Sequence, residues 1–335
     1  MTSGDIGGAE SSSVAAPPAV GKVDWRRLVA PVSVGVAVCV ILLAGGLTTR
    51  EFHTVDNFLI VVRSASITGI VALGMTFVTL SGNFFSLSVE QTAALCSIVF
   101  SEGLLHGFGL AASLVLALAT SIAVGLGQGF VIAAGLNPIV VTLGAGAALY
   151  GLAAVVTGNQ VVNFTTTSAT NWIGTGRPLG VPTQSWAFII LTIASTFILT
   201  RTRFGREIYL VGTSRPAARA SGLSVGKATV AAFTLSSLAA GMVGIFTAAQ
   251  FTQAPLTQFS GLNFDVIAAI LVGGAALQGG EGSTLRTALG AVFIAMLADL
   301  MLLRSASFGT RTLVTGLVVV VATSAFHLLR TRGRR

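Results

Sequence analysis

Asp299 is the ionisable residue placed most deeply in an apolar stretch of this 335-residue chain, between Ala-Met-Leu-Ala and Leu-Met-Leu-Leu. A carboxylate inside a bilayer is costly and normally faces the interior of a helix bundle or a cavity. Asp299 is therefore a candidate for a solute pathway or for pairing between helices, with Arg63 and Arg304 as candidate partners. Asp265 opens another apolar stretch, where it either lines the same pathway or caps the N-terminus of a helix.

The sequence contains no recognisable catalytic arrangement. Neither a Ser-His-Asp set nor a pair of carboxylates can be assembled, and the three histidines are scattered near the ends of apolar stretches. Cys39 and Cys96 lie alone within apolar runs, so neither a disulfide framework nor a metal site is indicated. The stretch 222–229 looks like a phosphate-binding loop, but it has too few residues between its glycines and has Ala after Lys227. We expect no enzyme activity and no ATP bound to this chain itself.

Two glycine-bearing breaks interrupt the apolar pattern, at 80–88 and at 271–283. In each break, an apolar run is followed by a glycine, a polar stretch and the start of a new helix. One such break lies in each half of the chain. Paired Gly-interrupted segments of this kind indicate a transport pathway. The helix starts there could offer free N–H groups to a polar solute. The alternative is that these glycines only allow helices to pack closely.

The composition of the chain is that of a membrane protein. Hydrophobic residues make up 53% and charged residues 9%, whereas water-soluble domains carry about 25% charged residues. Apolar runs of about twenty residues, the length that crosses a bilayer core, recur along the chain. The net charge of +8 does not indicate nucleic acid, because the charges lie in short loops and at the chain ends. We predict an all-α, polytopic integral membrane helical bundle in the lipid bilayer.

About ten transmembrane helices are predicted, with both termini in the cytoplasm. The spans are placed at 28–48, 58–80, 84–104, 109–133, 138–157, 185–200, 228–248, 264–278, 284–303 and 309–329. Most of the 19 Lys and Arg then lie on the cytoplasmic side, as the positive-inside rule requires. Residues 1–27 are predicted to be a disordered cytoplasmic tail, 28–330 a single transmembrane domain and 331–335 a basic tail.

The segment 201–227 is the predicted contact with a soluble cytoplasmic partner. It concentrates basic residues between two long apolar segments. Pro216 suits the first turn of a helix, the alanines after it favour a helix, and Gly222 can end one. On the opposite side of the membrane, the polar segment 158–184 either forms an interfacial helix and a surface for an extracytoplasmic partner or is a plain connecting loop.

From about Asn57 to His327 the chain resembles the permease subunits of ribose-type ATP-binding-cassette sugar importers. Five stretches carry the resemblance in the same order, at 74–78, 137–145, 202–212, 217–225 and 265–283. The resemblance implies a subunit of the bacterial plasma (inner) membrane that moves a sugar or a similar small polar solute inward by alternating access. It also implies four kinds of partner: two ATPase subunits that bind the ATP, a second permease chain that is identical or paralogous, an extracytoplasmic solute-binding protein and the lipid bilayer. No cofactor is expected on this chain.

The resemblance also assigns residues to the contact with the ATPase. In that family an Ala-Ala-x-x-Ser-Gly segment forms a short cytoplasmic coupling helix, which docks in a groove of the ATPase subunit. The matching positions here are Ala217, Ala218, Ser221 and Gly222, flanked by Arg215 and Arg219.

One stretch departs from the family. Where the family usually reads Asp-Leu-Ser-Val-Gly after the first break, this chain has Ser86-Leu-Ser-Val-Glu90. The solute contacts are therefore expected to differ from those made to an ordinary pentose. Sugars are held by polar groups beside aromatic faces, so the candidate pathway residues are Asn83, Phe84, Phe85, Gln91, Asp265, Gln278 and Asp299. Phe84 and Phe85 could equally pack against lipid or the protein core.

Two other kinds of transporter remain open. The nearer is an importer permease for a nucleoside, an autoinducer or a branched-chain amino acid. The other is an ion-coupled secondary transporter, which would work without an ATPase and for which Asp299 would serve as a buried carboxylate.

Overall fold

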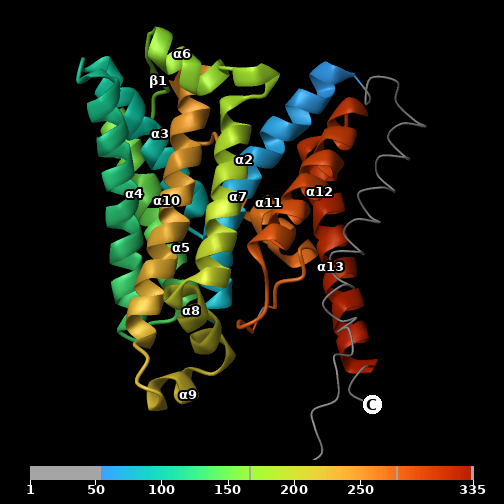
Figure 1. The fold of residues 1–335 in the computed structure, drawn as a ribbon. Coiled ribbons are helices and arrows are strands. Elements are labelled where there is room, and N and C mark those ends of the chain that lie inside the picture. Colours follow the sequence, from blue (N-terminus) through green and yellow to red (C-terminus); the bar gives the residue numbers. More distant parts are fainter. Residues whose placement is uncertain (1–53, 166, 277, 333–335) are drawn as a thin grey trace, which may run out of the picture.

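The computed structural model describes residues 54–332 apart from 166 and 277 (Figure 1). The predicted tail at 1–27, the predicted span at 28–48 and residues 333–335 lie outside the described residues. The described part is a bundle of α-helices with one pair of two-residue strands. Six of its helices are long and apolar enough to cross a membrane. The expectation of an all-α polytopic membrane protein is therefore met.

The elements follow one another along the chain in a simple order. They are α2 (Val55–Leu80), α3 (Val89–Leu105), α4 (Gly109–Ala133), α5 (Pro138–Thr157), β1 (Val162–Asn163), α6 (Ser168–Thr175), the 3-10 turn η2 (Pro178–Gly180), α7 (Thr183–Arg201), α8 (Arg203–Thr213), α9 (Arg215–Ala220), α10 (Val225–Phe251), β2 (Gln253–Ala254), α11 (Leu262–Val272), α12 (Thr284–Leu303) and α13 (Phe308–Arg332). In Figure 1, α8, α9 and the end of α13 lie at the lower end of the bundle, with α13 on the opposite side from α9, and α6 lies at the upper end.

The spanning helices divide into an inner and an outer set. In α2, α10 and α12, 61% of the most apolar window is buried inside the protein, whereas the value is 17% in α5 and 22% in α4. Buried side chains of α2, α10, α11 and α12 form the main core. The outer helices expose apolar side chains on their outer faces, and such faces are compatible with contact to lipid rather than to water.

Small residues bring the most extensive helix pair, α4 and α10, into backbone contact. A methyl carbon placed on Gly125 would lie 2.6 Å from the Cα of Thr234, and one on Gly129 would lie 2.7 Å from the Cα of Val230. The two glycines are four residues apart, so they share one face of α4 and let the helix backbones approach closely.

Three elements differ from the spans expected from hydropathy. Helix α3 begins at Val89, because the chain leaves the helical conformation after α2 and has no regular secondary structure through 83–86. The span expected at 264–278 is the 11-residue helix α11, which covers about half of a ~30 Å bilayer core. Helix α8 occupies part of the expected loop at 201–227, and it buries Gly205, Ile208 and Val211 on one face.

The segment between α5 and α7 contains the short helix that was one of the two expectations for 158–184. Thr167 caps α6 by accepting from the backbone N–H of Thr170, whose hydroxyl in turn accepts from the backbone N–H of Thr167. Strand β1 pairs with β2, with Val162 opposite Ala254, and this pairing joins the same region to the end of α10.

Candidate functional site

Helix α9 forms where the sequence carries its helix signals. The side chain of Ser214 accepts from the backbone N–H of Ala217 at 3.4 Å, and Pro216 lies in the first turn. Gly222 has φ +76°, a left-handed conformation that ends the helix and that residues with a side chain rarely adopt.

Most of α9 is exposed at one end of the bundle. Ala218 is 4% exposed and packs with Val211, Val225 and Ala228. The other small residues that were assigned to the coupling helix, Ala217, Ser221 and Gly222, are exposed, as is Arg219. A methyl group added to Gly222 would meet nothing within 4 Å. Helix α9 therefore presents a small, open surface of low bulk while one alanine anchors it to the bundle.

Arg215 differs from its neighbours because it points into the bundle. Its Nη2 donates to the carbonyl oxygen of Gly82 at 3.1 Å and to Oδ1 of Asn83. Burial, and to a lesser degree the nearby charge of Arg219, lower the pKa of Arg215. Its guanidinium nevertheless stays charged, because arginine does not lose its proton in proteins.

Asn83, an expected pathway residue, lies at this same end of the bundle. It is 2% exposed, and its Nδ2 donates to Ser81 Oγ at 2.8 Å and to Thr229 Oγ1 at 3.4 Å. Its amide is thus fully engaged with protein groups, including Arg215. The expected pathway residue Gln278 is exposed in the segment 273–283 between α11 and α12.

Helix α8 contacts the segment 273–283. The hydroxyl of Tyr209 donates to the carbonyl oxygen of Gly282 at 2.8 Å. Burial raises the pKa of Tyr209, an effect that the positive charge of Arg286 partly offsets. The phenol is therefore neutral and able to donate at physiological pH.

A group of polar residues surrounds the start of α3. Ser88 Oγ donates to Gln128 Oε1 at 2.9 Å, and the hydroxyl of Ser86 lies 3.1 Å from that of Ser88. Gln91 Oε1 and Gln128 Nε2 are buried and have no hydrogen-bond partner among the described residues. Gln128 is a pathway candidate that the sequence did not identify, because it lies within the apolar helix α4, in its last two turns.

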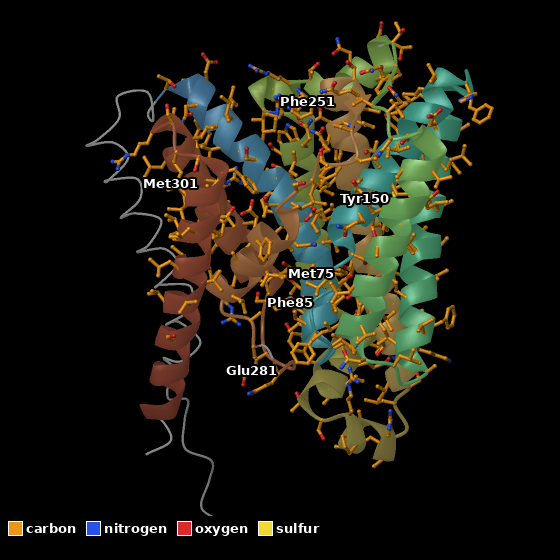
Figure 2. All side chains as sticks on the ribbon, turned by 180° about the vertical axis from the view of Figure 1, so that it is seen from behind. Met75, Phe85, Tyr150, Phe251, Glu281 and Met301 are labelled. Carbon is orange, nitrogen blue, oxygen red and sulfur yellow. The ribbon has the colours of Figure 1, made fainter. Side chains whose placement is uncertain are left out.

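The starts of α3 and α11 are joined to each other. Asn263 Nδ2 donates to the carbonyl oxygen of Leu87 at 3.0 Å, and the carboxylate of Glu90 lies close to the backbone N–H groups of Gly261 and Asn263. Phe84, 54% exposed, and the partly buried Phe85 lie just before this junction. Figure 2 labels Phe85 and Glu281, one from each non-helical segment, in the lower half of the bundle.

The two remaining pathway candidates have partners on other helices. Asp299 Oδ2 accepts from Asn57 Nδ2 at 2.8 Å, so its partner is an amide in the first turn of α2 and neither Arg63 nor Arg304. Asp265 forms an ion pair with Arg311 of α13 at 2.8 Å. Both carboxylates line one small pocket, together with Ser64 and Thr68 of α2.

The comparison with known proteins places the chain in a transporter family. The model of a family described as the permease component of branched-chain amino acid transport systems matches residues 57–323. The chain belongs to this permease family. It is 31% identical over 291 residues to the ribose import permease protein RbsC of Escherichia coli, covering 86% of this chain and 90% of that protein.

Other relatives of this permease have different names. A probable ABC transporter permease protein, YphD of Escherichia coli, is 32% identical over 90% of each chain. The autoinducer 2 import system permease protein LsrC of Yersinia pseudotuberculosis is 28% identical over 82% of this chain and 78% of that protein. No solved structure matches the chain. The resemblance to ribose-type permeases is thus confirmed, and the permease is a multi-pass protein of the bacterial inner membrane.

Proposed function

We propose that this permease imports a sugar or a similar small polar solute, driven by ATP hydrolysis on separate ATPase subunits. The observation that carries the proposal is the exposed helix α9, anchored through Ala218 in a chain related over most of its length to ribose import permeases. The face formed by Ala217, Ser221 and Gly222 would enter the groove of an ATPase subunit. Of the two arginines beside this face, the exposed Arg219 would flank the contact, whereas Arg215 faces the bundle.

The topology that fits this role has about ten spans. With α8 and α9 in the cytoplasm, the end of α13 lies on the same side (Figure 1), and the apolar run at 28–48 supplies a further span that starts from the cytoplasm. Residues 1–27 and 331–335 would then be cytoplasmic tails. The region around α6 would face outward, where a solute-binding protein could deliver its cargo.

The solute pathway is proposed to run past the two non-helical segments, as glycine-interrupted spans suggest for transporters. Phe84, Phe85, Gln91 and Gln128 supply aromatic faces and unsatisfied amide groups of the kind that hold sugars. Two permease chains, identical or paralogous, would enclose the pathway and alternate between outward-open and inward-open states. Asp265 and Asp299 are assigned to pairing between helices at its border.

Uptake by proteoliposomes tests this function. The permease is reconstituted with its ATPase and binding protein, and entry of labelled ribose is measured with ATP, without ATP and after deletion of 215–222. ATP-dependent uptake that is lost on deletion supports the proposal. ATP-independent uptake driven by an ion gradient would instead indicate a secondary transporter.

Autoinducer import is the second candidate, because a relative carries that name and Ser86 and Glu90 depart from the ribose-type sequence. Competition of labelled ribose uptake by autoinducer 2, nucleosides and branched-chain amino acids ranks these solutes. Stronger competition by one of them than by unlabelled ribose would reassign the substrate.

A further inference from the structure

We propose that α8 and α9 act as one coupling unit, in which Arg215 and Tyr209 transmit the movement of α9 to both segments that interrupt the spans, 81–88 and 273–283. The inference rests on the proposed importer function. It adds the residues that would carry movement from the ATPase surface into the bundle, and it gives Asn83 a role in coupling instead of solute binding.

The first link runs from α9 to the end of α2. One guanidinium of Arg215 binds both the carbonyl of Gly82 and the side chain of Asn83. Asn83 is held in turn by Ser81 and by Thr229 of α10. A planar guanidinium can hold two acceptors in a fixed geometry, whereas a lysine ammonium is a point charge on a flexible stem. Movement of α9 must therefore pull directly on residues 82–83.

The second link runs from α8 to the segment before α12. Tyr209 donates to the carbonyl of Gly282, and the backbone N–H of Gly280 donates to the carbonyl of Leu80 at 3.1 Å. The segment 273–283 is thus bound both to α8 and to the last residue of α2. The two interrupted segments, nearly 200 residues apart in the chain, meet under the coupling unit.

Glycine backbones fill the junction where these three elements meet. A methyl carbon on Gly212 of α8 would lie 1.8 Å from the carbonyl oxygen of Leu80 and 2.6 Å from the nitrogen of Gly280. A methyl carbon on Gly279 would lie 2.4 Å from the Cα of Gly82. Because backbone touches backbone with no side chain between, a displacement of α8 has no flexible group to absorb it.

The orientations of Arg215 and Arg206 distinguish a mechanical link from a purely electrostatic effect of positive charge. Arg215 is partly buried and faces inward, whereas Arg206, on the neighbouring helix α8, is exposed. Both carry the same charge at the same end of the bundle. Replacing Arg206 removes charge alone, and replacing Arg215 removes charge together with the link to residues 82–83.

Hydrogen exchange of the full-length permease in lipid nanodiscs tests the links, first without any partner. Arg215→Lys is expected to speed exchange of the backbone N–H of Asn83 about tenfold, because the segment that carries this N–H loses a charge-assisted hydrogen bond. Tyr209→Phe is expected to speed exchange in 273–283, and Arg206→Ala is expected to change neither segment. Unchanged protection of 81–88 in both Arg215→Lys and Arg215→Ala would overturn the first link.

The transmission itself is tested on the permease bound to its ATPase, with ATP analogue and without nucleotide. In the wild type, nucleotide is expected to change exchange in both segments together. Arg215→Lys should still bind the ATPase but lose the nucleotide effect at 81–88, while Arg206→Ala keeps it. A full nucleotide effect in Arg215→Lys would refute the inference and leave the importer function intact. Failure of the wild type to bind any ATPase would refute the importer function, and coupling with it.

Discussion

Gly129 should be essential to the packing of α4 on α10, and Gly127, two residues earlier, should not be. A methyl carbon on Gly129 would lie 2.7 Å from the Cα of Val230, whereas ordinary contact begins at 3.4 Å. The helices must then separate by about 0.7 Å, and overpacking of this kind costs about 1–3 kcal/mol. A methyl group on Gly127 would meet nothing within 4 Å.

Comparison of Gly129→Ala with Gly127→Ala isolates this packing effect. Alanine favours a helix over glycine by up to about 1 kcal/mol, and this gain is common to both variants. We expect Gly129→Ala to unfold with a free energy about 1–3 kcal/mol below that of Gly127→Ala. The measurement is reversible unfolding in mixed micelles titrated with SDS, followed by tryptophan fluorescence.

The double variant of Gly125 and Gly129 sharpens the test. Both glycines face α10, so a helix pair already separated by one methyl group has less contact left to lose. The double variant should therefore lose less free energy of unfolding than the sum of the losses in the two single variants. Equal stability of Gly129→Ala and Gly127→Ala would show that the helices tolerate separation, and the backbone-contact explanation would fail.

Three further predictions concern individual contacts. Asn57→Ala and Asp299→Ala should each lower thermal stability, and the double variant should lower it little further, because the two side chains share one hydrogen bond; fully additive effects in a thermal unfolding assay would contradict this. Gly222→Trp should cost about 1–2 kcal/mol because residue 222 has φ +76°, but its side chain meets open space, so the bundle should stay folded while solute-stimulated ATP hydrolysis is abolished; unchanged stimulation would exclude α9 as the docking surface. Burial raises the pKa of Tyr209, so its stabilising bond to Gly282 is fully present below the unfolded-state value of about 10 and is lost only as pH rises through the folded value. The ratio of exchange rates between Tyr209→Phe and wild type should therefore be equal at about pH 6 and pH 8.

Features that depend on a single stretch of chain were predictable. The bounds expected for α4 and α5, 109–133 and 138–157, match the structure because apolar length and local end signals determine such helices. The same holds for α9, where Pro216 and Gly222 mark the two ends. The start of α3 was wrong by five residues, because Phe84 and Phe85 extend the apolar run while the backbone around them is not helical.

Features that depend on pairing were not predictable. Asn83 and Arg215 lie 132 residues apart, and Asp299 and Asn57 lie 242 apart. Nothing in the residue types indicates these partners. For Asp299, charge considerations favoured arginines, yet the structure satisfies it with an amide. Helix α8 was missed for a related reason: its arginines indicated a solvated loop, and the buried face of Ile208 and Val211 is recognisable only once the bundle beneath it is known.

In the two interrupted segments, glycine both breaks the helical conformation and allows close packing. Gly82 has φ +71° and Gly279 has φ +87°, so each occupies a conformation that residues with a side chain rarely adopt. The same two glycines also leave no room for a methyl group between them. Gly82 thus follows directly on the end of α2 and also contacts Gly279, so glycine both turns the chain and brings the two segments together. A movement that reaches one segment must then reach the other, which is the physical requirement for both halves of an alternating-access permease to respond to a single displacement of α9.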